Sequence, residues 1–274
     1  MDLYFLNYAD DRLNYKGGLF RKNQVYLNEC ARKQGIKNII SLTSDDLIKT
    51  QFYKEHKDYL DKPVYENGHV FKPYIILDTL KKIHLGDIVF YYDCGSYSIN
   101  LPVKPIIALC KRNKGIVFHQ WGECNAKWTK RDAFVYMNCD TPKFHNAVAL
   151  QATWLFIMKT PFNLKLVEEW LYYNLDERVA SYVNPDTCGL PTLSGFVQNR
   201  GDQSILSNLA VKYNIRTFWG AGNGCNKEID RFTFAISPPL RIKIRNYYYK
   251  AKHCLATLPL IGKVGKRIKQ YLLG

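Results

Sequence analysis

The chain has 274 residues, of which 47% are apolar, and its formal net charge is +15 at pH 7. This length and composition can bury a substantial core, enough for one large α/β domain or two small ones. No stretch of about 18 apolar residues occurs, and the first residues have acidic flanks without a small-residue cleavage pattern. We therefore expect neither a membrane span nor a signal peptide.

The excess of positive charge is concentrated near the C-terminal end. No acidic residue follows Asp230, whereas ten lysines and arginines do, which leaves a net charge of +5 on residues 1–230. A basic protein first suggests a nucleic acid or an anionic surface as its partner. Because residues 1–230 are only mildly basic, their charge suits a domain that binds a phosphorylated ligand.

The eight cysteines are scattered, form no Cys-x-x-Cys pair and show no spacing to histidine that suits zinc. We therefore expect reduced thiols that pack as small apolar side chains in a cytoplasmic protein. The six histidines are isolated, and we expect each to be structural or exposed rather than a ligand.

The first predicted elements indicate a parallel sheet. Residues 3–10 form a short apolar strand, residues 17–36 hold apolar side chains near helical spacing, and residues 37–43 form a second strand. A strand, a helix and a strand in this order make a βαβ unit, whose two strands are parallel.

The next elements lead to a buried central strand. Residues 44–60 predict a helix with a serine or aspartate cap. A second helix, over residues 74–83, has Pro73 in its first turn. Residues 87–92, DIVFYY, are almost wholly apolar or aromatic, as in a central parallel strand that is buried on both faces.

The remaining elements alternate between helices and strands. Residues 104–121 predict a helix, a turn and a strand, residues 129–139 a helix capped by Thr129, and residues 147–160 a strand-rich core segment. An amphipathic helix over 161–176, a long loop over 177–201 and a helix over 202–215 follow, and residues 216–224 end the domain. A compact domain usually keeps such a long loop for a functional reason.

Polar residues follow two of the predicted strands where these strands end. Asn7, Tyr8 and Asp10 come at the end of the first strand, and Asp93 follows the buried central strand, with Gly95 two residues later. Ligands of an open parallel sheet bind beyond the carboxyl ends of the strands, so these groups should share one crevice. A carboxylate near a glycine suits a ribose hydroxyl or a diphosphate held through a divalent cation. The alternative is that Asp93 only caps a turn.

Two further segments carry cations suited to a phosphate. Lys72 directly precedes a predicted helix N-terminus, where positive charge and free N–H groups favour an anion, although it could equally be a solvated lysine. The string WTKRD places Thr129 and the cations Lys130 and Arg131 beside an aromatic residue, with Asp132 to orient a cation or a sugar hydroxyl. The same string could be a helix cap with surface charges.

The last predicted helix begins with Asp202 and Gln203, directly after the long loop. A carboxylate at this place could deprotonate an acceptor hydroxyl or grip a transferred sugar. The alternative is that Asp202 is the N-cap of the helix. No Gly-x-Ser-x-Gly, His-Glu-x-x-His or P-loop signature occurs, which argues against the hydrolases and nucleotidases that carry these motifs.

Five strings, in chain order, resemble a group of GT-A-type glycosyltransferases found in bacterial capsule and O-antigen clusters and in large DNA viruses that glycosylate their own surface proteins. The strings are FKPYIILDTL, GDIVFYYDCG, WTKRDAF, FNLKLVEEWLYY and RGDQSILSNLA. The group's usual patterns are WKPYII, GDhhhYhDhG (h is apolar or small), WTKRD and HRxDQSxLS, so Phe71 replaces a tryptophan and Asn199 a histidine. The resemblance covers about residues 3–220 and implies a GT-A-like, Rossmann-type α/β fold with a mixed, mainly parallel sheet flanked by helices.

The resemblance implies how the donor diphosphate would be neutralised. Asp93 matches the first aspartate of the Asp-x-Asp signature, which contacts ribose or a metal ion, Mn²⁺ or Mg²⁺. Gly95 stands where the second aspartate, the direct metal ligand, is usual. If the metal is absent or weakly held, Lys72, Lys130 and Arg131 are the available cations.

The resemblance also implies the remaining roles. Lys72 and the block from Thr129 to Asp132 match donor-side residues, and Asp202 and Gln203 match a pair that faces the donor sugar. If transfer inverts the anomeric centre, a carboxylate base is needed on the acceptor side, and we expect Asp202 first and Asp132 next. If transfer retains configuration, no such base is required.

The implied reaction moves a sugar from a nucleotide-sugar donor to a hydroxyl of a growing surface glycan, in a domain over residues 1–235. A basic extension over residues 236–274 follows, in which basic residues alternate with Ile, Tyr and Leu. Such a mixture can lie on an anionic membrane and would suit a peripheral enzyme with a lipid-linked acceptor. The alternatives are an appendage packed on the domain or a nucleic-acid-binding tail, and no motif supports a nucleic-acid partner. The alternative function is a non-catalytic basic module that binds a nucleotide or a membrane.

Overall fold

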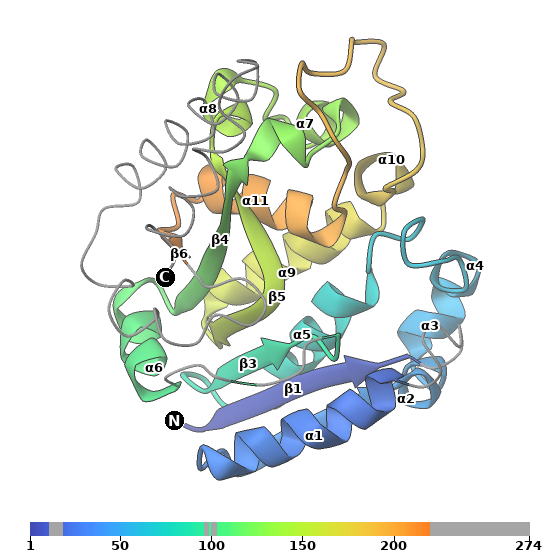
Figure 1. The fold of residues 1–274 in the computed structure, drawn as a ribbon. Helices are drawn as coiled ribbons and strands as arrows, with labels where there is room; N and C mark the ends of the chain where they lie inside the picture. The colour runs from blue at the N-terminus through green and yellow to red at the C-terminus, as the bar shows by residue number, and fades with distance from the viewer. Residues whose placement is uncertain (11–18, 96–98, 100–102, 220–274) are drawn as a thin grey trace, which may run out of the picture. The chain divides into compact units, whose positions relative to one another are not determined.

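The computed structural model describes residues 1–10, 19–95, 99 and 103–219 (Figure 1). The predicted extension over 236–274, the domain boundary at 235 and the end of the segment 216–224 lie outside these described residues. In the described part, no helix is long and apolar enough to cross a membrane.

The core of the fold is a six-stranded sheet with the order β2-β1-β3-β5-β4-β6. The strands are β1 (Leu3–Ala9), β2 (Asn38–Thr43), β3 (Ile88–Tyr92), β4 (Ile116–Cys124), β5 (Val148–Met158) and β6 (Phe218–Trp219). Only β5 runs antiparallel to its neighbours, β3 and β4, whereas the pairs β1–β2, β1–β3 and β4–β6 are parallel. The predicted α/β fold with a mixed, mainly parallel sheet is therefore confirmed.

Helices cover both faces of this sheet (Figure 1). The long helices are α1 (Leu19–Lys33), α5 (Phe71–Lys82), α6 (Val103–Arg112), α9 (Pro161–Asn174) and α11 (Asp202–Lys212). Successive residues of β3 point to opposite faces, so Ile88 packs with α1 and α6 while Val89 packs with α5, α9 and α11. All five residues of β3 are buried, which confirms the predicted central strand.

The helix predicted over residues 44–60 is wrong as a single element. The structure divides it into α2 (Ser44–Ile48), α3 (Gln51–Glu55) and α4 (Lys57–Leu60). The cause is local, because Thr43 caps α2 in a capping box with Asp46, and the Thr50 side chain accepts the Tyr53 N–H and caps α3. Two threonine caps within eighteen residues favour short helices over one long helix.

The predicted cap at Thr129 is also wrong. The helix α7 (Arg131–Tyr136) has Lys130 at its N-cap position, and the Thr129 hydroxyl instead donates to the side-chain oxygen of Asn125 at 2.8 Å. Three short elements were not predicted, the 3-10 turn η1 (Asn125–Lys127) and the helices α8 (Pro142–His145) and α10 (Glu177–Ala180). The segment from α10 to α11 is irregular, as predicted.

Candidate active site

The carboxyl ends of β1 and β3 bring the predicted strand-end residues to one edge of the sheet. The two strands are parallel, with Leu6 paired to Tyr91, so Tyr8, near the end of β1, and Asp93, directly after β3, lie at the same edge of the sheet. The backbone N–H of Asp93 donates to Thr153 of β5 at 2.8 Å, which fixes the start of the turn after β3. The rigid sheet therefore positions the Asp93 carboxylate at the edge where ligands of such folds bind.

Lys72 joins the two predicted aspartates. Its ammonium lies 2.8 Å from the Asp202 carboxylate and 3.3 Å from that of Asp93, and it donates to the carbonyl of Ala152 at 3.2 Å. Lys72 is the second residue of α5, so it lies inside the first helical turn rather than directly before it. Only 5% of its side chain is exposed, so the alternative of a solvated lysine is wrong.

A close contact between two glycines delivers Asp202 to this cluster. Gly201, not Asp202, is the N-cap of α11, so the N-cap alternative for Asp202 is wrong. Gly201 has φ of 48°, and a Cβ there would lie 2.5 Å from the Tyr182 ring and 2.7 Å from the Cα of Gly68. The Asp202 N–H donates to the carbonyl of Gly68 at 3.1 Å, which fastens the start of α11 to the chain before α5.

Three residues that sequence reasoning missed complete the cluster. The Tyr91 hydroxyl donates to Asp93 at 2.6 Å, and the Tyr182 hydroxyl lies 2.9 Å from His69 Nδ1 and hydrogen-bonds Asp202. His69 Nδ1 is 3.8 Å from the Asp202 carboxylate. Only Tyr91 had a sequence signal, because two residues along a strand put it on the same face as Asp93.

The charges of this cluster are set by burial and by Lys72. Burial alone would lower the pKa of Lys72, but the Asp202 and Asp93 carboxylates outweigh it and the net shift is upward. Burial raises the pKa of Asp202, although Lys72 opposes the shift. Burial, helped by the Lys72 cation, lowers the pKa of His69 to about 4. At neutral pH the site therefore holds a protonated lysine and a neutral imidazole beside two carboxyl groups.

Of the two carboxylates in the cluster, that of Asp93 is the one exposed enough for a metal ion to reach. Its side chain is 31% exposed, whereas that of Asp202 is 4% exposed and paired with Lys72. Among the described residues no group of three or more histidines, cysteines, aspartates and glutamates could hold a metal ion. One protein carboxylate fits Mg²⁺ or Mn²⁺ only together with phosphate oxygens of a substrate, which is a common arrangement for Mg²⁺.

The Asp132 carboxylate is held by the loop between α10 and α11. Its carboxylate accepts the backbone N–H groups of Thr187 and Cys188, each at 2.8 Å, and the Thr187 hydroxyl at 2.9 Å. These hydrogen bonds outweigh complete burial and lower the pKa of Asp132. Because its oxygens are already occupied, Asp132 anchors the loop between α10 and α11 and does not fit a catalytic base.

The two cations of the same block also lie apart from the Lys72 cluster. Arg131 pairs with Asp140 at 2.7 Å and donates to the carbonyl of Pro191. Lys130 is 2% exposed, and its ammonium has no hydrogen-bond acceptor in the described part of the chain. The predicted donor-side role of the block thus has no contact with Asp93 or Asp202 to support it.

Two other predicted donor residues, Asn7 and Gly95, differ in their surroundings. The Asn7 amide is buried, donates to Asn28 at 2.7 Å and accepts from Gln24 at 2.9 Å, so it links β1 to α1 and does not face the crevice. Gly95 is exposed, and among the described residues a Cβ there would meet only the Phe20 ring, at 3.7 Å. Packing against the described residues therefore does not require a glycine at position 95.

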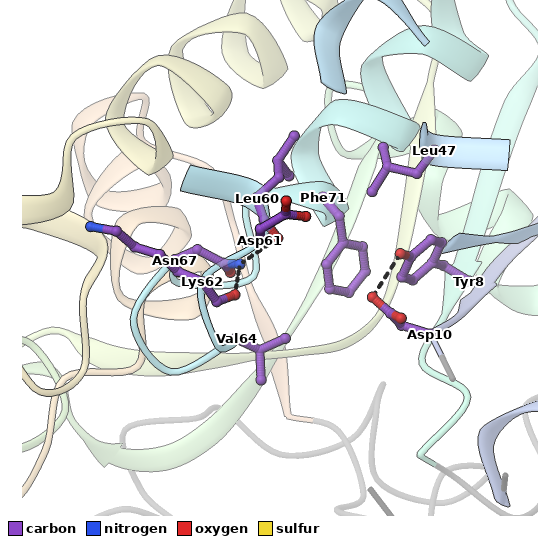
Figure 2. A pocket seen from close by; sticks show the side chains of 9 residues that line it. All are labelled: Tyr8, Asp10, Leu47, Leu60, Asp61, Lys62, Val64, Asn67 and Phe71. Carbon is purple, nitrogen blue, oxygen red and sulfur yellow. Dashed lines mark hydrogen bonds between the residues drawn. The ribbon is translucent and has the colours of Figure 1, made fainter. Parts of the chain in front are cut away.

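A pocket of about 130 Å³ lies between the end of β1 and the start of α5 (Figure 2). It is lined by Tyr8, Asp10, Leu47, Leu60, Asp61, Lys62, Val64, Asn67 and Phe71. The rings of Tyr8 and Phe71 stack with centroids 4.4 Å apart, and the Tyr8 hydroxyl donates to Asp10 at 3.1 Å. Phe71 directly precedes Lys72, so this aromatic pocket adjoins the charged cluster.

Searches with protein-family models and among curated proteins find no match. Two solved structures are similar in part. One is a glycosyltransferase involved in the glycosylation of the major capsid of PBCV-1, with 14% identity, a TM-score of 0.35, and coverage of 64% of this chain and 67% of that one. The other is mouse xyloside xylosyltransferase 1 in its apo form, with 7% identity, a TM-score of 0.45, and coverage of 80% and 85%.

Proposed function

We propose that the chain is a glycosyltransferase that moves a sugar from a nucleotide-sugar donor to a hydroxyl of a surface glycan. One observation carries this proposal. Lys72, Asp93 and Asp202 come from three of the five strings that resemble the glycosyltransferase group, and they meet within 3.3 Å at the carboxyl edge of the sheet. The contact between Lys72 and Asp202 joins positions 130 residues apart. The Lys72 cation and the partly exposed Asp93 carboxylate lie beside an aromatic pocket.

The pocket fits the nucleoside of the donor. An aromatic face such as that of Tyr8 or Phe71 can stack on a base, and the carboxylate of Asp10 can accept a ribose hydroxyl. The donor diphosphate would then extend from the pocket toward Lys72 and Asp93. Lys72 follows Phe71 in the chain, so one helix start would contact both parts of the donor.

The departing diphosphate gains negative charge, which a cation must stabilise. Lys72 is the protein's own cation at this point, and Asp93 would hold Mg²⁺ or Mn²⁺ together with phosphate oxygens. Such an ion, when bound, would neutralise the leaving group. Gly95 provides no second carboxylate, so we expect weak metal affinity without the donor.

Asp202 fits the role of the base if configuration inverts. Its raised pKa suits a group that takes the proton of the acceptor hydroxyl while the bond from the anomeric carbon to the diphosphate breaks and a new carbon–oxygen bond forms. Lys72 holds this carboxylate in the resting protein. Donor phosphates that attract Lys72 would weaken that pair and free an oxygen of Asp202.

The test is hydrolysis of a panel of nucleotide sugars by the full chain, with and without Mn²⁺. We expect turnover of at least one donor and loss of donor affinity in Asp93→Ala. The matched control is Asp78→Ala, which changes a partly exposed aspartate of α5 that pairs with Lys82. If no donor binds or turns over, and Asp93→Ala changes no ligand affinity, the proposal fails. The alternative, a non-catalytic basic module that binds a nucleotide or a membrane, would then be favoured.

The acceptor and the membrane are a separate part of the proposal. The basic extension over residues 236–274 would hold the enzyme on an anionic membrane, near a lipid-linked acceptor. Deletion of residues 241–274 should reduce binding to anionic liposomes while donor hydrolysis continues. Equal liposome binding by both proteins would remove the membrane part and leave the reaction untouched.

A further inference from the structure

A cluster of two tryptophans and an arginine lies near the charged site. The ring centroids of Trp121, in β4, and Trp128, directly after η1, are 4.3 Å apart. The Arg200 guanidinium lies over both rings, 5.2 Å from the centroid of Trp121 and 4.8 Å from that of Trp128. All three side chains are only partly exposed, so the cation is held by the indole faces.

This cluster holds hydrogen-bond donors for which the described residues offer no acceptor. Nε of Arg200 and Nε1 of Trp128 are both shielded from water without an acceptor in the part of the chain that the structure describes. The Arg200 guanidinium likewise has no carboxylate partner among the described residues, whereas Arg178, which also lies over a ring, pairs with Asp176 at 2.6 Å. Shielded donors without acceptors are costly, so two of them in one cluster point to a ligand that supplies acceptors.

Local hydrogen bonds fix these donors in place. The Ser204 hydroxyl accepts the backbone N–H of Arg200 at 2.9 Å and donates to the carbonyl of Trp128. The backbone N–H of Gln203 donates to the carbonyl of Arg200 at 3.1 Å. The start of α11 therefore holds Arg200 and Trp128 together. Arg200 lies two residues before Asp202 in the chain.

The cluster lies on the other side of the charged site from the nucleoside pocket. Three strand spacings separate β4, which carries Trp121, from β1, which carries Tyr8, and this corresponds to about 14 Å. The Arg200 charge nevertheless reaches the site, because it contributes to the low pKa of His69 after burial and Lys72. A ligand group at Arg200 would thus be near Asp202 but away from the nucleoside.

We propose that Trp121, Trp128 and Arg200 form an acceptor subsite for a sugar that carries an anionic group, such as the carboxylate of a uronic acid. The inference rests on the proposed function. The apolar face of a sugar ring would pack on an indole, and the guanidinium would bind the carboxylate through two parallel hydrogen bonds. The Nε1–H group of Trp128 would donate to another oxygen of the sugar.

The anionic oxygens could come from an acidic acceptor or from the phosphates of the donor, and the test separates these sources. Tryptophan fluorescence of the full chain is titrated with methyl β-D-glucuronide, with methyl β-D-glucoside as the neutral match, and with inorganic pyrophosphate. We expect the wild type to bind the glucuronide about tenfold more tightly than the glucoside, as one charged hydrogen-bonded pair provides. Equal binding of the two glycosides would overturn the subsite.

Variants of the arginine decide whether the preference depends on it. Arg200→Gln should lose the tenfold preference, Arg200→Lys should keep part of it, and Arg178→Gln, in which a paired arginine is changed, should keep all of it. A preference that persists in Arg200→Gln would overturn the inference. If pyrophosphate displaces the glucuronide and Arg200→Gln loses pyrophosphate affinity to the same extent, the site belongs to the donor and the acceptor assignment is wrong.

Donor hydrolysis by the wild type, measured without acceptor, distinguishes failure of the acceptor subsite from failure of the proposed function. If the wild type hydrolyses a nucleotide sugar but shows no preference for the glucuronide, only the acceptor subsite fails. If it binds and hydrolyses no donor, the proposed function fails, whatever the outcome with the glycosides.

Discussion

Lys72 and Lys130 are both removed from water, with 4% and 2% of their surfaces exposed, but their environments shift the two pKa values in opposite directions. Burial lowers the pKa of Lys130, and the surrounding carboxylates, Asp132 first, do not compensate. Two carboxylates in direct contact reverse the effect of burial at Lys72. Lys72 in the crevice is therefore a stable cation, whereas the charged form of Lys130 is poorly stabilised.

The aspartates of these two regions differ in the same way. Asp202 is held by a lysine in a buried site and has a raised pKa, whereas Asp132 is held by backbone N–H groups and has a lowered pKa. A carboxylate with a raised pKa can accept a proton, and one surrounded by donors resists it. The Lys72 crevice therefore combines a stable cation with a carboxyl group of raised pKa, whereas the region around Asp132 holds a carboxylate that anchors a loop.

The largest expected effect is on turnover and distinguishes Asp202 from Asp132. Asp202→Asn should lower transferase turnover by about 10²–10⁴-fold, because it removes the group that would take the acceptor proton. Asp132→Asn should leave turnover within a few fold and lower the free energy of unfolding by about 1–3 kcal/mol, because one of the two acceptor oxygens becomes an NH₂ donor that faces the donors of Thr187. Turnover and urea unfolding measure both. An equal loss of turnover in the two variants would show that Asp132 belongs to the reaction after all.

The second prediction concerns the lysines. Lys72→Met leaves two carboxylates without their cation and should lower the free energy of unfolding by about 3–5 kcal/mol. Lys130→Met removes an ammonium that lacks an acceptor among the described residues, so it should be neutral or stabilise the fold by about 1 kcal/mol. Urea unfolding of both variants at pH 7 provides the measurement. Similar losses would mean that Lys130 has a stabilising partner that the comparison has missed.

The third prediction uses the pH dependence of the crevice. The pKa of His69 is about 4 in the folded chain, below the ordinary value of 6.5, because of burial and the Lys72 cation. Between pH 6.5 and 4 the unfolded chain therefore binds a proton that the folded chain does not, so the free energy of unfolding should fall as the pH falls through this window. His69→Gln should flatten this dependence, whereas Tyr182→Phe, which keeps the imidazole, should retain it. If the free energy of unfolding of His69→Gln depends on pH as that of the wild type does, groups other than His69 cause the dependence.

Much of the fold follows from local sequence. The apolar run before Asp93 predicted a buried central strand, and the βαβ opening predicted the parallel pair of β1 and β2, as the structure confirms. The break of residues 44–60 into three helices did not follow, because Thr50 can either sit inside a helix or cap the next one. Such a choice depends on the packing of the segment, which the helical pattern does not contain.

The site was predictable where a local pattern carried it and not where it depends on distant contacts. Lys72, Asp93 and Asp202 lie in strings that resemble one enzyme group, and the structure brings them together. The anchoring role of Asp132 depends on Thr187, 55 residues away, and the contact of His69 with Tyr182 spans 113 residues. Neither contact leaves a trace in the local sequence.

The smallest expected effect is on metal affinity at Gly95, which stands where the Asp-x-Asp signature usually has its second aspartate. Among the described residues, a Cβ at this exposed position meets only the Phe20 ring, at ordinary van der Waals distance, so Gly95→Asp should change the free energy of unfolding by less than about 0.5 kcal/mol. A second carboxylate beside Asp93 should raise the affinity for Mn²⁺ about tenfold, since ligand charge largely determines such affinities. Gly95→Asn, equal in size but uncharged, is the matched control, and Mn²⁺ titration by calorimetry is the measurement. If both variants bind Mn²⁺ with the affinity of the wild type, Asp93 is not part of a metal site. Lys72 alone must then neutralise the diphosphate.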